Sequence, residues 1–214
     1  MTTNEIDFKK FPTTRYQGNK RKVLPMIHNS LKDVKFNTVL DACGGSGSVS
    51  YLFKKMGKEV TYNDKLRFNY LIGKAIIEND EITNTEDECR KIIKPVGGQT
   101  YKNFIAKTFK DVYYLTKENK WLDIVSTNII SMNGVNKPVS EYKAALAYYA
   151  LFQSCMIKRP FNLFHRKNLE IRTNDVVRNF GNKKTWERSF DSHFLQFSKE
   201  ANNLLHFHSL PVVR

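Results

Sequence analysis

Residues 41–47 read Asp41-Ala42-Cys43-Gly44-Gly45-Ser46-Gly47, a glycine-rich run between two apolar stretches. Residues 38–43 form a short apolar run that is typical of a buried parallel strand, and residues 48–56 predict a helix that Gly57 closes. Glycines let the backbone approach a ligand closely at such a strand-to-helix turn. The stretch therefore predicts an α/β fold with a nucleotide-type cofactor at the end of the first strand.

An acidic residue stands at the matching place after the next strand. Residues 59–63 predict that strand, and Asp64 follows it, 23 positions after Asp41. A carboxylate there can accept hydrogen bonds from ribose hydroxyls. The spacing fits NAD as well as S-adenosylmethionine, but acidic groups on both sides of the loop repel pyrophosphate and favour the positively charged S-adenosylmethionine. Alternatively, Asp64 only caps the helix predicted for residues 67–78.

The remaining elements continue this pattern and then depart from it. Apolar residues at helical spacing predict a helix over 23–31, so that helices and strands alternate as at the start of a parallel α/β sheet. Residues 140–157 predict another helix, whose apolar stretch is too short to cross a bilayer and contains Gln153. The run Asn203-Leu204-Leu205-His206-Phe207 predicts a third strand.

The charge balance indicates a polyanionic partner. Thirty-five Lys and Arg residues against 21 Asp and Glu residues give a formal net charge of +14, and the sequence pI is about 9.6. Such a surplus favours nucleic acid over a merely solvated surface, because cations that neutralise phosphates release condensed counterions. Cys43, Cys89 and Cys155 lack the spacing of a disulfide framework or a metal site. With no signal-peptide pattern at the N-terminus, we expect a cytoplasmic protein without a membrane segment or a bound metal.

Three motifs in order resemble those of a known family. The pattern Asp41-x-Cys43-x-Gly45-x-Gly47 resembles the D-x-F-x-G-x-G motif of DNA adenine-N6 methyltransferases, with Cys43 where Phe is usual. Upstream, Arg15-Tyr16-Gln17-Gly18-Asn19-Lys20 resembles the aromatic-x-G-x-K signature of the Dam-like (D12 class) group, and Tyr62-Asn63-Asp64 resembles its acidic motif. Residues 159–169 and 180–186 look like segments of adenine methylases from restriction–modification systems. The resemblance covers most of the chain.

The resemblance implies a fold and a domain order. The fold would be an S-adenosylmethionine-dependent methyltransferase (Rossmann-like) parallel sheet, incomplete, with a mostly helical and basic insertion that recognises DNA. Residues 1–90 would form the cofactor-binding α/β portion, residues 91–200 the DNA-recognition region, and residues 201–214 a return strand to the sheet.

The resemblance also assigns cofactor residues. Tyr16, Gln17 and Gly18 would line the methionine side of S-adenosylmethionine, and Lys20 would lie between the cofactor and DNA. The loop itself would consist of Asp41, Cys43, Gly45 and Gly47, and Asp64 would hold the ribose. For Tyr16 and Cys43 the alternative is packing in the core.

A basic segment follows the long predicted helix. Residues 158–188 contain nine Lys or Arg residues against three acidic ones, interleaved with aromatic residues. Cations hold phosphates, arginines can read guanine, and aromatic rings can stack on bases. The alternative is that the rings form a small core of their own and the cations are solvated. The candidates for contact with double-stranded DNA are Lys20, Arg166, Lys167, Arg172, Arg178, Lys183 and Lys184.

No catalytic residue can be assigned. Enzymes of this family hold a flipped adenine with an Asp/Asn-Pro-Pro-Tyr tetrapeptide, and no proline of the chain stands in that pattern. The nearest stretch, Asn136-Lys137-Pro138-Val139, lacks the aromatic residue. We therefore expect the catalytic half to come either from a second polypeptide or from a C-terminal half that a truncated product lacks. We also expect a partner chain, or a second copy of this chain, on the open edge that the glycine-loop strand would otherwise leave. The alternatives are a non-catalytic DNA-binding module with a vestigial cofactor fold and, less favoured by the charge and by Tyr16-x-Gly18-x-Lys20, an oxidoreductase.

Overall fold

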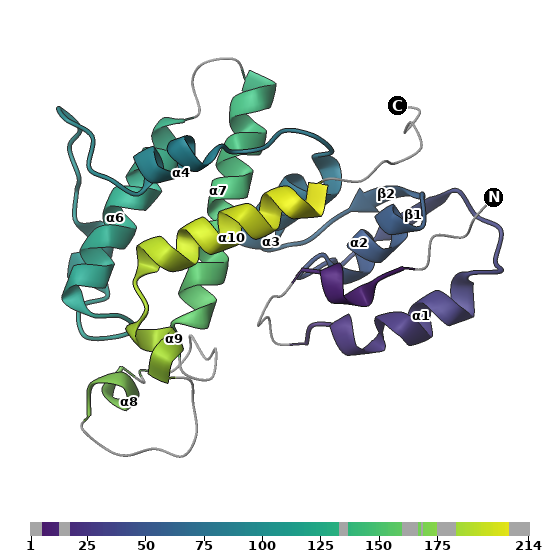
Figure 1. The fold of residues 1–214 in the computed structure, drawn as a ribbon, viewed down its shortest axis with the longest axis horizontal. Helices are drawn as coiled ribbons and strands as arrows, with labels where there is room; N and C mark the ends of the chain where they lie inside the picture. The colour runs from purple at the N-terminus through teal and green to yellow at the C-terminus, as the bar shows by residue number, and fades with distance from the viewer. Residues whose placement is uncertain are drawn as a thin grey trace.

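A computed structural model describes residues 6–12, 18–132, 137–159, 167, 169–174 and 183–205. Its elements form two groups joined by two long helices (Figure 1). In chain order they are η1 (Phe8–Lys10), η2 (Arg21–Val23), α1 (Leu24–Leu31), β1 (Thr38–Asp41), α2 (Ser48–Lys55), β2 (Glu59–Tyr62), α3 (Arg67–Gly73), η3 (Lys74–Glu78), α4 (Glu86–Ile92), α5 (Phe104–Thr108), α6 (Thr116–Ser131), α7 (Lys137–Ile157), α8 (Glu170–Thr173), α9 (Lys183–Glu187) and α10 (Phe190–Leu205).

The two strands form a parallel pair, as the sequence predicts. Strand β1 pairs with β2 in a register that sets Thr38 opposite Glu59 and Asp41 opposite Tyr62. Helix α2 connects them, so the strand–helix–strand–helix order expected for residues 38–78 is confirmed. Because side chains alternate along a strand, Val39 and Val60 turn toward the helices, whereas Leu40 lies on the other face and is 65% exposed.

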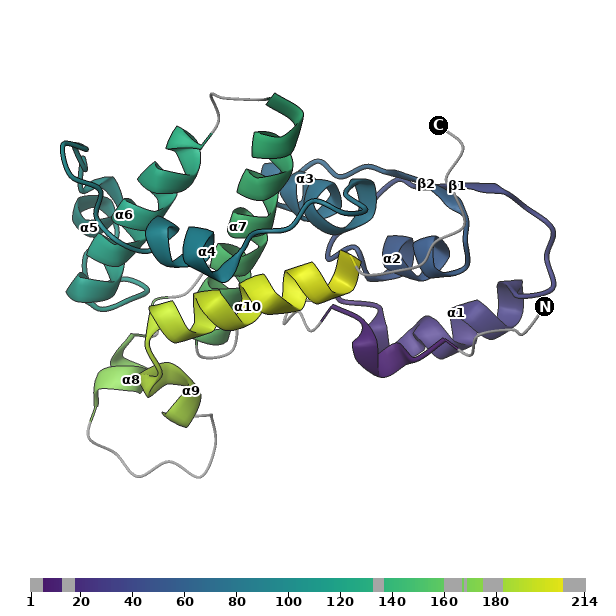
Figure 2. The same ribbon diagram turned by 45° about the horizontal axis from the view of Figure 1, so that its top comes forward.

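Two hydrophobic cores lie side by side and share helices. The first core is built around α2, α3 and η3, with Tyr51, Leu52 and Ile76 among its buried residues. The second is built around α4 and α6, with Leu122 and Val125 among its buried residues. Helices α7 and α10 contribute to both cores, and Figure 2 shows α10 crossing α7 between the two groups of helices. The division at residues 90 and 200 stays a prediction.

The third strand predicted for residues 203–207 is wrong over 203–205, which form the last turn of α10; His206 and Phe207 lie outside the described residues. Phe190, Phe194 and Phe197 recur at helical spacing and are buried in the second core. Leu204 and Leu205 continue this apolar face into the first core. The run of apolar residues that suggested a strand is therefore the buried end of an amphipathic helix.

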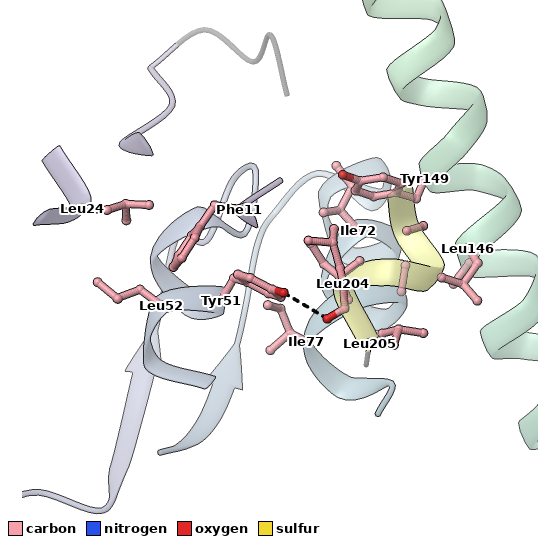
Figure 3. Close-up of a cluster of buried hydrophobic side chains, with 14 residues drawn as sticks. Phe11, Leu24, Tyr51, Leu52, Ile72, Ile77, Leu146, Tyr149, Leu204 and Leu205 are labelled. Carbon is pink, nitrogen blue, oxygen red and sulfur yellow. Dashed lines mark hydrogen bonds between the residues drawn. The ribbon is translucent and has the colours of Figure 1, made fainter. Parts of the chain in front are cut away.

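A tyrosine hydroxyl holds this helix end in place. The Tyr51 hydroxyl, on α2, donates to the carbonyl of Leu204 over 3.0 Å (Figure 3). That carbonyl belongs to the last turn of α10, where carbonyls have no partner within the helix. Burial raises the pKa of Tyr51 well above its usual value, so the hydroxyl stays protonated and can donate.

Within the described part of the chain, no helix is both long and apolar enough to cross a membrane.

We predict that Tyr51→Phe lowers the free energy of unfolding by about 1–3 kcal/mol, because it leaves a buried carbonyl without a donor. Urea denaturation measures this change. Tyr70→Phe is the matched control, since Tyr70 is 47% exposed and its hydroxyl can be replaced by water. Equal effects of the two substitutions would contradict the role given to the Tyr51 hydroxyl.

Candidate cofactor site and recognition segment

The glycine loop is a tight turn between β1 and α2. The N–H of Gly47 donates to the carbonyl of Gly44 over 2.9 Å. Gly45 and Gly47 have φ angles of +55° and +73°, which residues with a Cβ adopt only at a cost. A Cβ added at Gly47 would lie 3.7 Å from the side chains of Ile72, on α3, and Ile76, on η3. The loop therefore has its shape before any ligand binds.

Asp64 closes the loop from the second strand. One of its carboxylate oxygens accepts the N–H of Gly45 over 2.9 Å, and the other accepts the N–H of Leu66, also over 2.9 Å. Burial tends to raise the pKa of Asp64, but hydrogen bonds from Leu66, Asn69 and Gly45 outweigh burial and lower it. Asp64 is thus a carboxylate at neutral pH. It caps the start of α3 through Leu66, and it also orders the glycine loop through Gly45; its contact with a ribose stays a prediction.

Asp41 is held in a similar way at the end of β1. The Ser50 hydroxyl, from the first turn of α2, donates to one carboxylate oxygen of Asp41 over 2.5 Å. Among the described residues, no hydrogen bond to its other oxygen occurs. Asp41 therefore has a fixed orientation and spare capacity to accept hydrogen bonds.

Tyr62 supports the loop from below, a role that the sequence did not reveal. Its hydroxyl donates to the carbonyl of Gly45 over 2.7 Å and lies 3.1 Å from the carbonyl of Asn69. A Cβ added at Gly44 would lie 2.1 Å from the Tyr62 ring, and one at Gly73 would lie 2.3 Å from it. Both glycines are required because the ring fills the space between the loop and α3. An aromatic residue two positions before Asp64, on the inward face of β2, was the available signal.

The upstream motif reaches the same loop through Asn19. Its side-chain oxygen accepts the Ser48 hydroxyl over 3.0 Å and the N–H of Arg21 over 2.7 Å. Neighbouring Gly18, with φ +81°, and Lys20 are exposed, whereas Tyr16 and Gln17 lie outside the described residues. Cys43 is exposed in the loop, so core packing is excluded for Cys43. The structure therefore brings Gly18, Lys20, Asp41, Cys43, Gly45, Gly47 and Asp64 into one region.

The candidate DNA contacts in the basic segment divide into different environments. Lys167 and Lys184 are exposed. Arg166, Arg178 and the side chain of Lys183 lie outside what the structure describes. Arg172 departs from the expectation that it faces DNA: its side chain is 5% exposed and ion-paired with Glu118. Its planar guanidinium makes two parallel hydrogen bonds within the protein, which removes it from the surface.

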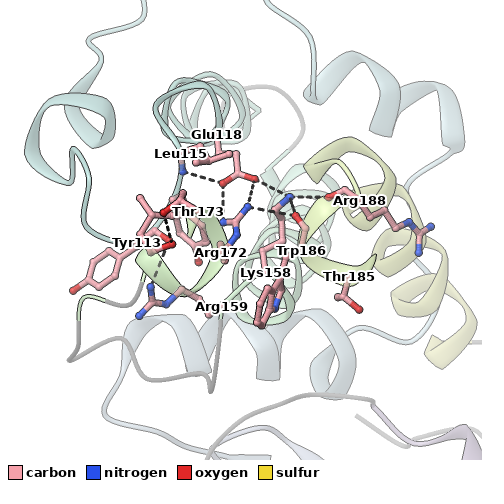
Figure 4. Close-up of polar contacts among 12 residues, drawn as sticks. Tyr113, Leu115, Glu118, Lys158, Arg159, Arg172, Thr173, Thr185, Trp186 and Arg188 are labelled. Carbon is pink, nitrogen blue, oxygen red and sulfur yellow. Dashed lines mark hydrogen bonds and ion pairs between the residues drawn. The ribbon is translucent and has the colours of Figure 1, made fainter. Parts of the chain in front are cut away.

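Glu118 is the centre of this buried charge cluster (Figure 4). Arg172 donates to its two carboxylate oxygens over 2.9 and 2.8 Å, and the Lys158 ammonium lies 2.7 Å away. The side chains of Glu118 and Lys158 are 8% and 3% exposed. Burial tends to raise the pKa of Glu118, but hydrogen bonds from Arg172 and Lys158 lower it overall. Burial lowers the pKa of Lys158, and Glu118 opposes that change.

No motif in the sequence indicates that Glu118 and Lys158 interact. Glu118 also accepts the N–H of Leu115, at the start of α6, so locally it resembles an ordinary helix-capping glutamate. Its cationic partners come from positions 158 and 172, and only the folded chain brings them together.

A glycine turn on a parallel strand pair, closed by an acidic residue after the second strand, defines a class of proteins that bind nucleotide-type cofactors. The profile of the family described as D12 class N6 adenine-specific DNA methyltransferase matches residues 16–209, and the chain belongs to this family. It is 29% identical over 192 residues to the Type II methyltransferase M2.HphI of Haemophilus parahaemolyticus. The aligned residues make up 86% of the chain and 54% of that relative. The chain thus spans about half the length of this relative. No solved structure matches significantly.

We predict that Gly44→Ala lowers the free energy of unfolding by about 1–3 kcal/mol, because the added methyl group collides with the Tyr62 ring and displaces it. Urea denaturation again provides the measurement. At Gly97 nothing lies within 4 Å of an added Cβ, so Gly97→Ala serves as the matched control. If Gly44→Ala were as stable as Gly97→Ala, the Tyr62 ring would not support the loop as described.

Proposed function

We propose that this chain is the cofactor-binding and DNA-recognition portion of a DNA adenine-N6 methyltransferase of a restriction–modification system, acting in the cytoplasm. The observation that carries the proposal is the glycine loop held by Asp64 through the N–H of Gly45. Its strands would be the start of the Rossmann-like parallel sheet of the methyltransferase fold. Family membership supports adenine as the methylated base.

The donor and acceptor chemistry of the loop fits S-adenosylmethionine. The Asp64 carboxylate accepts the N–H groups of Gly45 and Leu66 and a hydrogen bond from Asn69, which leaves acceptor capacity on its two oxygens for a ribose hydroxyl. Asp41 and Asp64 place negative charge at either side of the loop, which suits a sulfonium cation and disfavours the pyrophosphate of NAD. S-adenosylmethionine, when bound, supplies a methyl group on a positively charged sulfur. The chain's own residues bind and orient it, and the ordered loop lowers the entropic cost of doing so.

Exposed cations support double-stranded DNA as the substrate. Lys20 is exposed and adjoins Asn19, which bonds to the first turn of α2. A phosphate held by Lys20 would therefore lie near the cofactor loop. Lys167 and Lys184 extend positive charge onto the recognition segment, where they would neutralise further phosphates.

The tetrapeptide that holds the flipped adenine would come from outside these 214 residues, either from a C-terminal half or from a partner polypeptide. Among the described residues, β1 pairs with β2 and with no other strand, and Leu40 on its uncovered face is 65% exposed. An unpaired strand edge with apolar neighbours readily accepts another strand. We place the catalytic polypeptide at this edge, beside the glycine loop.

Asp64→Ala is expected to lower the affinity for S-adenosylmethionine by about tenfold or more, because it removes charge-assisted hydrogen bonds to the ribose. Isothermal titration of the chain with S-adenosylmethionine and, separately, with NAD measures this. Asp33 is exposed and lies between α1 and β1, outside the glycine loop, so Asp33→Ala is the control for loss of one negative charge. Unchanged affinity in Asp64→Ala would refute the ribose assignment, and tighter binding of NAD than of S-adenosylmethionine would refute the choice of cofactor.

Methyl transfer provides the test of the whole proposal. We expect transfer of a labelled methyl group to adenine N6 in duplex DNA when the chain is mixed with a family polypeptide that carries Asp-Pro-Pro-Tyr, and none with either polypeptide alone. Transfer by the chain alone would refute the need for a second polypeptide. Binding of DNA and S-adenosylmethionine without transfer in the mixture would identify a non-catalytic module.

A further inference from the structure

Two short helices of the basic segment (residues 158–188), α8 and α9, belong to neither hydrophobic core. Leu169 and Trp186 are buried beside α8 and within α9, yet the residues of both cores come from other elements. A cavity of about 500 Å³ separates α8 and α9 from the start of α6 and the start of α10, with Trp121, Trp186 and Phe190 in its walls. Apolar packing alone therefore leaves the position of α8 and α9 loosely defined.

Hydrogen bonds and ion pairs cross this gap, and they converge on one carboxylate. Arg172, from α8, binds both oxygens of Glu118. Lys158, directly after α7, binds Glu118 and also donates to the carbonyls of Trp186 and Arg188 over 2.9 and 2.7 Å. The beginning and the middle of the basic segment are thus bound directly to a single residue of α6, Glu118, and the end of the segment is attached to it through Lys158.

Other polar contacts also join the basic segment to the neighbouring elements. Arg159 is fully buried, lies over the Tyr113 ring at 4.7 Å, and donates to the carbonyl of Tyr113. The ring of His193, on α10, lies 2.9 Å from the carbonyl of Thr185 in α9. Figure 4 shows Glu118, Lys158 and Arg172 close together, with Arg159 beside Tyr113. Both views of the fold place α8 and α9 away from the two strands.

We infer that Glu118 is a positioning residue for DNA sequence recognition, acting through Arg172 and Lys158, and that Arg172 is not itself a DNA contact. The inference rests on the proposed function and deepens it. Glu118 sets the direction of α8 and α9. The exposed Lys184 belongs to α9, and the exposed Lys167 comes shortly before α8 in the sequence. Sequence is read by side chains that must reach base edges in the correct geometry. A shift of α8 or α9 therefore costs discrimination between sequences more than it costs phosphate binding.

The test separates positioning from simple electrostatics. The full 214-residue chain selects its preferred duplex from a random-sequence pool, and dissociation constants are then measured for this duplex and for a scrambled one. Glu118→Gln makes the chain more positive, so electrostatics alone predicts tighter binding of both duplexes. Positioning predicts instead that discrimination falls by about tenfold or more, as when a base contact is misplaced, while affinity for the scrambled duplex does not fall.

Two further variants serve as comparison. Lys117 is the exposed neighbour of Glu118 in the sequence, and Lys117→Gln is expected to weaken both duplexes alike and leave discrimination unchanged. Arg172→Lys keeps the charge but loses the two-pronged contact, and we expect it to reduce discrimination as Glu118→Gln does. Binding of S-adenosylmethionine is expected to remain within about twofold in all three, because the glycine loop lies in the other core.

Each outcome decides the matter. Full discrimination in Glu118→Gln or in Arg172→Lys would overturn the inference. If Glu118→Gln loses S-adenosylmethionine binding as well, it has disturbed the whole fold, and Arg172→Lys then decides alone. If the unaltered chain selects no sequence, the proposed function fails at DNA recognition, which is a different result from a chain that selects a sequence and keeps it without Glu118.

Discussion

Helix α10 lies across α7, and this crossing is the constraint on which the rest of the structure depends. One half of α10 places Phe194 and Phe197 in the second core, and its other half places Leu204 in the first. Alanines 144, 145, 147 and 150 of α7 are buried in the two cores, and small side chains on a helix let its neighbours approach closely. The side chain of Asn202 accepts the N–H of Asn84 and donates to its carbonyl. These two bonds fix the connection between η3, which follows α3, and α4. The glycine loop and the basic segment are therefore held in defined positions relative to each other, although they lie at different cores.

The glycine loop shows how a binding site is prepared by residues that do not bind. Gly45 and Gly47 have backbone angles that suit glycine, but Gly44 is required for a different reason, the ring of Tyr62. The same tyrosine bonds to the loop at Gly45 and reaches α3 at Asn69. Asp64 adds a second attachment at Gly45. A loop held at two points has little conformational entropy left to lose when a ligand binds.

Most of the first 80 residues could be predicted from the sequence because their signals are local. A glycine turn, two short apolar runs and the residues that flank them define β1, α2, β2 and α3 without long-range information. Residues 203–205 were assigned to a strand because a short apolar run does not distinguish a buried strand from a buried helix end. The spacing of Phe190, Phe194 and Phe197 carried the missing information. The contact between Tyr62 and Gly44 could not be predicted, since it depends on how tightly β2 and the loop pack.

The basic segment shows why composition overstates the charge that is available to DNA. Of its nine cations, Lys158, Arg159 and Arg172 have buried side chains. Lys158 and Arg172 are paired with Glu118, and Arg159 contacts Tyr113. A buried ion pair of this kind is seldom the most stable solution, because apolar residues of similar volume often do as well without the cost of desolvation. Apolar residues, however, do not restrict the orientation of the groups that they hold together. The planar guanidinium of Arg172 accepts only a narrow range of orientations at a carboxylate. Under the proposed function the segment would have to present cations and base-reading side chains at fixed places, and it would need that restriction more than added stability.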